Sequence, residues 1–337
     1  MRIFTFLQLI VLCVLFSGCG KESAIITSCN NLMEQRKYEE ASSILEKALR
    51  DNPKSVKLLR QRVLFFLKVE QPGYAIAAYR TLQDVNPKDT ILYKALGNKD
   101  PIIRVTAARA LGPMKDPNAL NPLIKASKDP EKSVRHAVVQ ALGDLKNKKA
   151  IPVLVDFLKD EDWSVRGEAA FALGKIGDAQ AAASLFPIVN DPDSYVQKNV
   201  RNALEELATE ENKQAYLNAL SSNDFAIQTM AAIALSNIGH TEGLRVLLAQ
   251  LDNPENKDLR DIIRALEKSK DPAALPGLRR TVNHPDLRVR IEAILALGIF
   301  QDKDSVPMLK TLSVDKEQNG NVRTACLIAL NRITGGN

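Results

Sequence analysis

The stretch DWSVRGEAAFALG, residues 162–174, decides the fold because its pattern returns along most of the chain. In it, the hydrophobic and basic pair Val165-Arg166 is followed by Ala172-Leu173. A fixed period of this kind indicates a repeat array, in which each unit buries its apolar face only by stacking on its neighbours. The same pattern begins at Ile103-Arg104, Val134-Arg135, Val289-Arg290 and Val322-Arg323, and a weaker form at the same 31-residue spacing begins at Val196-Gln197 and Ile227-Gln228.

Each repeat is predicted to be a pair of helices. In the unit at residues 150–180, apolar residues from Ala150 to Leu158 lie at helical spacing, and Pro152 fits the first turn, where its missing N–H has no helical partner. The second helix is expected from Trp163 to Ile176. Its small alanines let neighbouring helices approach closely. The glycines that follow Ala-Leu have the same effect, and they are Gly112, Gly143, Gly174 and Gly298.

An acidic residue precedes the basic residue by four positions in several repeats. An aspartate at a helix start caps free N–H groups, and an i,i+4 pair with arginine adds a small stabilisation. The arginine series is either an anion-binding stripe or a structural ladder of ion pairs between stacked units, and we favour the ladder. The ladder residues are Arg104, Arg135, Arg166, Arg290 and Arg323, and the acidic residues are Asp100, Glu131, Asp162 and Asp286.

These motifs resemble the short HEAT-like repeats named after the phycobilisome lyases, with the pattern D-x-x-V-R-x-x-A-x-x-A-L-G. The resemblance covers residues 97–337 in about eight units. It implies an all-α fold, a right-handed α-α superhelix (solenoid), with function on an extended surface. It does not identify the ligand, because such repeats are scaffolds in many unrelated proteins.

Residues 24–96 carry a different repeat, with a period of 34. Ala41, Leu45, Ala48 and Pro53 recur as Ala75, Tyr79, Leu82 and Pro87. This pattern resembles the second helix of tetratricopeptide units, although the first-helix positions match poorly. We expect two tetratricopeptide-like units and a short helix, residues 90–96, that joins them to the HEAT-like array and to its stabilising contacts.

The first residues are predicted to be a targeting signal, since Arg2 precedes an apolar run that ends at Leu15-Phe16-Ser17-Gly18-Cys19. This end resembles a bacterial lipobox. The resemblance implies that residues 1–18 are removed, that Cys19 carries lipid (a palmitate-type label), and that residues 19–23 form a linker. Gly20, in place of an acidic retention signal, favours the periplasmic face of the outer membrane over the inner membrane. The alternatives are an N-terminal membrane anchor, for which the run is short, and a signal peptide cut elsewhere.

Composition argues against catalysis and nucleic-acid binding. The net charge is +6, but basic and acidic residues are interleaved without a basic run. His136, His240 and His284 lack metal-ligand spacing, and the His-Glu motifs of HEAT-like di-iron hydroxylases are missing. We therefore expect no metal, no cofactor and no small-molecule substrate. Cys29 and Cys326 lie at opposite ends of the array, so each is expected to be a core residue rather than half of a disulfide.

The sequence thus favours a lipid-anchored cell-envelope scaffold that binds protein partners and is not an enzyme. The alternative is an accessory or chaperone-like subunit of a lyase-type enzyme that acts on a partner's cofactor. By the HEAT resemblance, the second helices line a binding groove, where exposed apolar residues in a row indicate a contact site. The alternative is that the array coils tightly and the side chains at these positions pack against adjacent second helices. The groove positions are Arg109, Gln140, Phe171, Asn202, Ile233, Arg264, Leu295 and Ile328.

Overall fold

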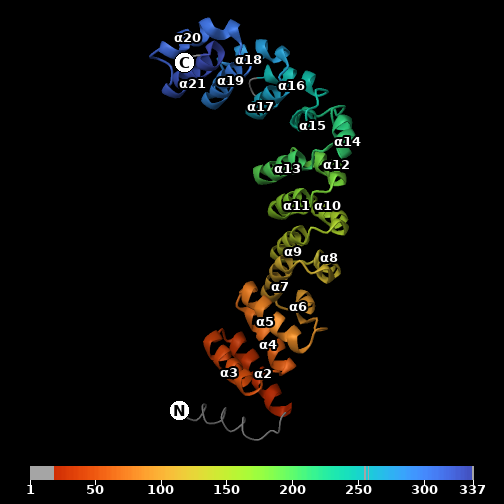
Figure 1. The fold of residues 1–337 in the computed structure, drawn as a ribbon. Coiled ribbons are helices and arrows are strands. Elements are labelled where there is room, and N and C mark those ends of the chain that lie inside the picture. Colours follow the sequence, from red (N-terminus) through yellow and green to blue (C-terminus); the bar gives the residue numbers. More distant parts are fainter. Residues whose placement is uncertain (1–18, 254–255, 257, 336–337) are drawn as a thin grey trace. The chain divides into compact units, whose positions relative to one another are not determined.

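The computed structural model describes residues 19–253, 256 and 258–335, and their regular structure is helical throughout (Figure 1). The fold class predicted from the repeats, an all-α solenoid, is confirmed. The chain divides into two compact units, residues 1–176 and 177–337. The predicted signal, residues 1–18, lies outside the described residues.

The N-terminal unit begins with two helical hairpins. They consist of α2 (Cys19–Glu34), α3 (Tyr38–Asp51), α4 (Val56–Lys68) and α5 (Pro72–Val85), followed by the short α6 (Ile91–Lys94). The residues that the 34-residue period selects are core residues, since Ala41, Leu45, Ala75 and Tyr79 are all buried. The Tyr79 hydroxyl donates to a backbone carbonyl oxygen just before α6, at 2.5 Å. This bond ties the second hairpin to the short helix that was expected at residues 90–96.

The start of α2 differs from the prediction. Residues 19–23, which we expected to form a linker, make the first turns of α2 instead. After one glycine, this segment contains the helix-favouring residues Lys21 and Glu22, and no helix breaker separates it from the following turn. Among the described residues, no helix is long and apolar enough to cross a membrane.

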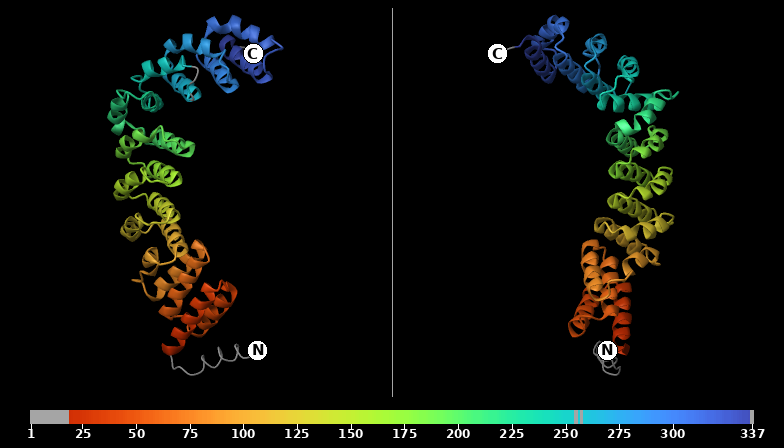
Figure 2. Two further views of the ribbon diagram at one scale, coloured as in Figure 1. Left: turned by 180° about the vertical axis from the view of Figure 1, so that it is seen from behind. Right: turned by 45° about the vertical axis from the view of Figure 1, so that its right-hand side comes forward.

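The rest of the N-terminal unit alternates long and short helices. The long second helices are α7 (Pro101–Met114), α9 (Lys132–Leu145) and α11 (Trp163–Ile176), and the short first helices are α8 (Leu120–Ala126) and α10 (Ile151–Phe157). Pro152 lies in the first turn of α10, as predicted. In this unit the second helices form one row and the first helices another (Figure 2).

The C-terminal unit continues the alternation. Its second helices are α13 (Ser194–Leu207), α15 (Phe225–Asn237), α17 (Leu259–Ser269), α19 (Leu287–Ile299) and α21 (Gly320–Thr334). The first helices are α12 (Ala182–Leu185), α14 (Lys213–Ala219), α16 (Leu244–Leu251), α18 (Leu275–Thr281) and α20 (Val306–Val314). Cys29 and Cys326 are buried free thiols, as expected of core residues.

Close approach of second helices depends on glycine. A Cβ atom on Gly143 of α9 would lie 2.9 Å from the Cβ of Ala172 of α11. A Cβ on Gly298 of α19 would lie 2.8 Å from the Cα of Ala329 of α21. Both distances are shorter than side-chain contacts allow, so the glycine after Ala-Leu sets the helix spacing, as the sequence predicted.

Candidate functional site

Two ladder arginines bridge successive repeats in the N-terminal unit. Arg104 of α7 forms two parallel hydrogen bonds to the Asp129 carboxylate, from Nε at 2.6 Å and from Nη2 at 2.9 Å. Arg135 of α9 holds Asp160 in the same way, at 2.7 and 3.0 Å. Each aspartate lies in the loop before the next second helix, and all four side chains are largely buried. The carboxylates raise the pKa of both guanidinium groups, which therefore act as structural cations between stacked repeats.

The arginine at this position of the repeat also holds the loop that precedes its own helix. Arg135 Nη1 donates to the backbone oxygens of Asp129 and Pro130, at 3.2 and 3.0 Å. Arg166, Arg290 and Arg323 donate to the corresponding loop carbonyls.

Glutamine preserves this loop contact where it replaces arginine. The side-chain amide of Gln197 donates to the backbone oxygen of Asp191 at 2.7 Å, and that of Gln228 donates to the backbone oxygen of Ser222 at 2.5 Å. Each acceptor lies six residues before its donor, as in the arginine repeats. Loop closure is thus the role shared by arginine and glutamine at this position.

Arg104 and Arg135 form their hydrogen-bonded ion pairs with the following loop rather than with the acidic residue four positions earlier, and Asp100 and Arg104 interact as nearby charges. The Asp100 carboxylate caps its helix through the Ile102 N–H and pairs with Lys68, while Glu131 makes no side-chain capping bond. The physical reason is direction, because a capping carboxylate folds back over the first turn while the arginine extends toward the loop. The capping role itself holds at Asp162, Asp193, Asp224 and Asp286.

Most of the predicted groove positions reach the surface, with one exception. Phe171 and Ile328 are 45% and 40% exposed. Arg109, Asn202 and Arg264 are exposed, while Gln140 and Leu295 are partly exposed. Arg264 also pairs with Glu292 of the next second helix, Nε to Oε1 at 2.6 Å. These positions are divided between the two units.

Ile233 is the exception, because it is 2% exposed and so belongs to the core. It lies in α15, where every residue from Thr229 to Ser236 is buried. A helix that is apolar on all sides is buried on all sides, and the run Met-Ala-Ala-Ile-Ala-Leu at residues 230–235 carried this signal. The groove interpretation therefore fails at Ile233.

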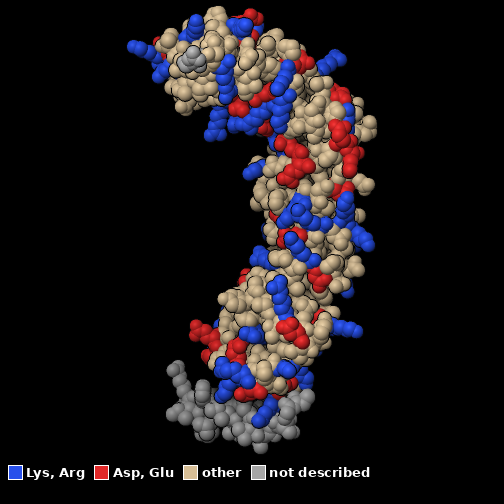
Figure 3. Space-filling view, viewed as in Figure 1, with Lys and Arg blue, Asp and Glu red and all other residues tan. Residues whose placement is uncertain are grey.

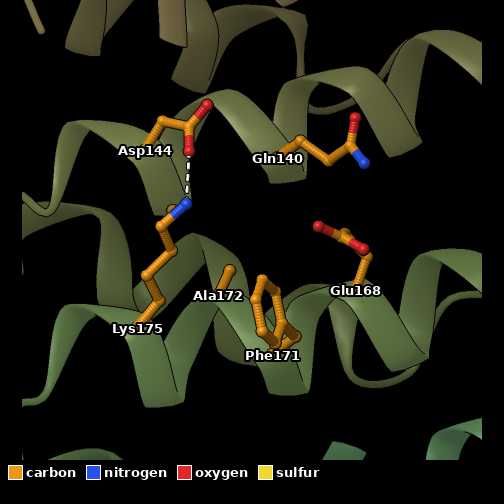
Figure 4. Close-up of a pocket in the computed structure, with 7 residues that line it drawn as sticks. Gln140, Asp144, Glu168, Phe171, Ala172 and Lys175 are labelled. Carbon is orange, nitrogen blue, oxygen red and sulfur yellow. Dashed lines mark hydrogen bonds and ion pairs between the residues drawn. The ribbon is translucent and has the colours of Figure 1, made fainter. Parts of the chain in front are cut away.

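A shallow hollow of about 280 Å³ lies between α9 and α11 (Figure 4). The Asp144–Lys175 pair, Oδ1 to Nζ at 2.5 Å, occupies one end, and the side chains of Gln140 and Glu168 lie across from each other at the other end. The aromatic ring of Phe171 lies between these two ends. The residues that line the hollow include Gln140, Asp144, Glu168, Phe171, Ala172 and Lys175.

Charged groups and an aromatic ring line this hollow together. The Lys175 Nζ lies 5.9 Å from the centroid of the Phe171 ring, within the range of a cation–π interaction. Glu168 is 8% exposed, and one of its carboxylate oxygens lies 4.0 Å from His136 Nε2. The hollow thus combines two carboxylates, one ammonium group already paired and a half-exposed ring.

Sequence reasoning located Gln140 and Phe171 but missed Asp144, Glu168 and Lys175. The missing signal is helical spacing, because Glu168 and Lys175 lie about one turn before and after Phe171 on the same face. A single position per repeat could not show that these charges share one hollow with Phe171.

A second charged cluster lies within the C-terminal unit. Arg201 of α13 pairs with Asp258, just before α17, and with Asp261 in α17, with nitrogen–oxygen distances of 2.5 and 2.7 Å. Charged side chains of both signs gather over α17 and α19 in Figure 3. Within the described residues, no group of His, Cys, Asp and Glu is arranged to hold a metal ion.

Comparison with known proteins identifies the repeat. A family model for HEAT repeats matches residues 120–205, 182–267 and 246–331, and a model for the PBS lyase HEAT-like repeat matches residues 103–129. No curated protein matches the chain.

Solved structures match the chain at low sequence identity. A chain from the structure of Kap95p with RanGDP matches with a TM-score of 0.61 at 14% identity, over 99% of this chain and 53% of that one. The CpcE–CpcF complex of phycocyanin lyase from Nostoc sp. matches with a TM-score of 0.36 at 20% identity, over 73% and 96%. Human deoxyhypusine hydroxylase matches with a TM-score of 0.33 at 24% identity, over 77% and 99%. The chain therefore shares its fold with the Kap95p structure.

Proposed function

This chain belongs to the HEAT-repeat family, and from that premise we propose that it is a protein-binding scaffold without catalytic activity, held at the cell envelope by lipid on Cys19. The observation that carries this proposal is the exposure of Phe171 beside the hollow in the N-terminal unit. Aromatic residues are enriched at the centre of protein–protein contacts, and Phe171 presents such a ring beside a hollow.

The polar residues of the repeats support binding rather than catalysis. The ladder arginines are engaged by carboxylates and loop carbonyls. His240 is similarly engaged, because its ring nitrogens lie 2.5 Å from a Glu210 carboxylate oxygen and 2.9 Å from Lys213 Nζ. These groups hold the repeats in register, so the exposed second-helix face is the surface available for a partner.

Affinity capture from detergent-solubilised envelope tests the scaffold function. We expect the wild-type protein to recover a protein partner in fixed stoichiometry and Phe171→Asp to lose it with an unchanged melting temperature. Phe225→Asp is the matched control, since Phe225 is also exposed, at 68%, but lies at the start of α15. A co-purified cofactor in place of a partner would overturn the scaffold in favour of a lyase-type accessory subunit.

The lipid anchor needs its own test. The proposed anchor rests on the lipobox-like sequence that ends at Cys19. Cys19→Ser is expected to abolish labelling by a palmitate analogue and to release the protein into the soluble fraction. Fractionation of the two membranes then tests the proposed outer-membrane location. Labelling that persists in Cys19→Ser would refute the anchor.

A further inference from the structure

We propose that α13, α15 and α17 form a salt-sensitive joint in the C-terminal unit, held closed by the ion pairs of Arg201 with Asp258 and Asp261. This inference does not depend on the scaffold function, because it concerns how the repeats are held together. It starts from one position of the repeat, two residues before the alanine of Ala-Leu. In α13 the residue at this position is Arg201. In the other second helices from α7 to α19 the residue is apolar and fully buried, and these residues are Ala108, Val139, Ala170, Ala232, Ile263 and Ile294.

The glycine that permits close approach of second helices is replaced in all three helices of the joint. The residues that follow Ala-Leu in α13, α15 and α17 are Glu205, Ser236 and Glu267. The Ser236 hydroxyl donates to the backbone oxygen of Ala265 at 2.5 Å, so a hydrogen bond holds α15 to α17. Glu205 is exposed. The approach that Gly143 allows between α9 and α11 is therefore not available to α13 and α15.

The arginine ladder is interrupted at the same helices. Arg104 and Arg135 each hold the loop of the next repeat through a largely buried carboxylate. Gln197 of α13 and Gln228 of α15 keep the contact to their own loops. A neutral amide cannot form an ion pair, however, so neither glutamine replaces the charged link to the next repeat. The apolar residue, the glycine and the charged ladder link, which together fix α9 on α11, are thus all absent at α13.

A single charged contact joins α13 to the beginning of α17, the second helix two repeats later. Arg201 Nη2 lies 2.5 Å from Asp258 Oδ1, and Arg201 Nη1 lies 2.7 Å from Asp261 Oδ2. The three side chains are between 19% and 34% exposed, whereas the ladder carboxylates of Asp129 and Asp160 are 8% exposed. Dissolved salt therefore screens the contact at the joint more strongly than it screens the ladder.

The helix α15 is the axis of the joint, because it packs against both α13 and α17. Every residue from Thr229 to Ser236 is buried, and most of these side chains are apolar. Apolar contacts have no fixed direction, so α13 can turn on α15 once Arg201 is released, while the Ser236 bond keeps α15 on α17. The angle between α13 and the repeats from α17 onward is thus set by a charge contact that a competing ion can release.

Double electron–electron resonance on the detergent-solubilised full chain tests the joint. The spin labels are attached to p-acetylphenylalanine in place of two exposed residues, Lys198 of α13 and Arg288 of α19, so the natural cysteines stay unmodified. The comparison pair replaces Arg109 of α7 and Phe171 of α11, helices joined by the ladder and by close packing. Between about 0.01 M and about 1 M salt, the Debye length falls from about 30 Å to about 3 Å. We expect the 198–288 distance distribution to broaden and to shift to longer distances over this range, while the 109–171 distribution stays the same.

Variants assign the change to Arg201. Arg201→Ala should give the broad distribution already at low salt, and so should Asp258→Asn combined with Asp261→Asn. Arg264→Ala is the matched control, because it removes an ion pair between the adjacent helices α17 and α19, from Arg264 Nε to Glu292 Oε1 at 2.6 Å. It should leave the distribution narrow at low salt. Melting curves by circular dichroism verify that each variant is folded. If Arg201→Ala does not fold, the asparagine variant and the salt series on the wild-type chain decide.

Three outcomes would overturn the joint. They are a 198–288 distribution that is the same at both salt concentrations, equal broadening in Arg264→Ala and Arg201→Ala, and equal broadening of the 109–171 pair at high salt. The last outcome would mean that salt loosens all the repeats alike. Broadening that is confined to the 198–288 pair and reproduced by Arg201→Ala supports the joint. Capture of a partner tests the scaffold function separately, so either inference can fail while the other stands.

Discussion

Asp129 is held from two sides by successive repeats: its carboxylate accepts two hydrogen bonds from Arg104, and its backbone oxygen accepts one from Arg135. Asp160 continues the series, because its carboxylate accepts from Arg135 and its backbone oxygen from Arg166 at 2.8 Å. Each loop is therefore fixed by its own repeat and by the preceding one. The ladder therefore links successive repeats through a continuous series of contacts to the loops, and its ion pairs are not isolated from one another.

Arg135→Ala should lower the free energy of unfolding by about 3 kcal/mol, because it removes the guanidinium group that pairs with the buried Asp160 carboxylate and donates to two loop carbonyls. Arg135→Gln should cost less, because a glutamine can keep the loop contact that Gln197 and Gln228 make. Urea unfolding followed by circular dichroism measures both. Arg109→Gln, at an exposed position of α7, is the control. Equal losses in Arg135→Ala and Arg135→Gln would show that loop closure contributes nothing.

Gly143→Ala should destabilise the N-terminal unit by about 1–3 kcal/mol, because the new methyl group would meet Ala172 and force α9 and α11 apart. Gly73→Ala provides the contrast. A Cβ on Gly73 of α5 meets nothing within 4 Å, so this change should stabilise the helix by up to about 1 kcal/mol. Thermal unfolding measures both variants. A loss at Gly73 similar to that at Gly143 would indicate that helix spacing is not the cause.

Arg201 should couple energetically to α17. A double-mutant cycle between Arg201→Ala and Asp258→Asn is expected to give a coupling energy of roughly 1 kcal/mol, since all the groups retain some contact with solvent. The coupling should fall at high ionic strength, because salt screens partly exposed charges. Urea unfolding at low and high salt provides the measurement. A coupling energy near zero would mean that the contact does not help to hold α13 and α17 together.

The buried thiol of Cys326 should make the C-terminal unit less stable at alkaline pH. Burial raises the pKa of its thiol to about 11, from an ordinary value of 9.0. The folded state therefore retains this proton where the unfolded chain loses it, so stability should fall as the pH rises past 9 and continue to fall until about 11. Subtracting the unfolding curve of Cys326→Ala isolates this contribution from other titrating groups. A difference that is flat over this range would contradict the prediction.

The sequence specified the helices and the ladder position well, because periodicity depends only on which residues face the core. It misassigned the partners of Arg104 and Arg135, since a carboxylate four residues away in the same helix competes with one in the next loop, and only three-dimensional packing decides between them. Asp129 and Asp160 are separated from those arginines by a whole first helix. No local pattern connects such residues.

The candidate site shows the same limit. Phe171 was found because it is a large apolar residue at an outward position, whereas Ile233, also a large apolar residue at the equivalent position, is buried. What distinguishes them is the composition of the surrounding helix. The segment around Phe171 carries Glu168 and Lys175, while Ile233 lies in a run without charge. Burial therefore follows from the whole helix rather than from one position in the repeat.

The ladder and the Asp144–Lys175 pair join α9 and α11 at opposite ends. Arg135 and its loop contacts lie at the beginning of α9, and Asp144 lies at its end, roughly 13 Å away by helix geometry. The separation of the two helices is thus fixed on both sides of the hollow. A hollow held in this way is preorganised, so a partner side chain that enters it loses its own conformational freedom but does not have to order the protein around it. Selectivity between partners then depends on the shape and charge of the side chain that enters the hollow.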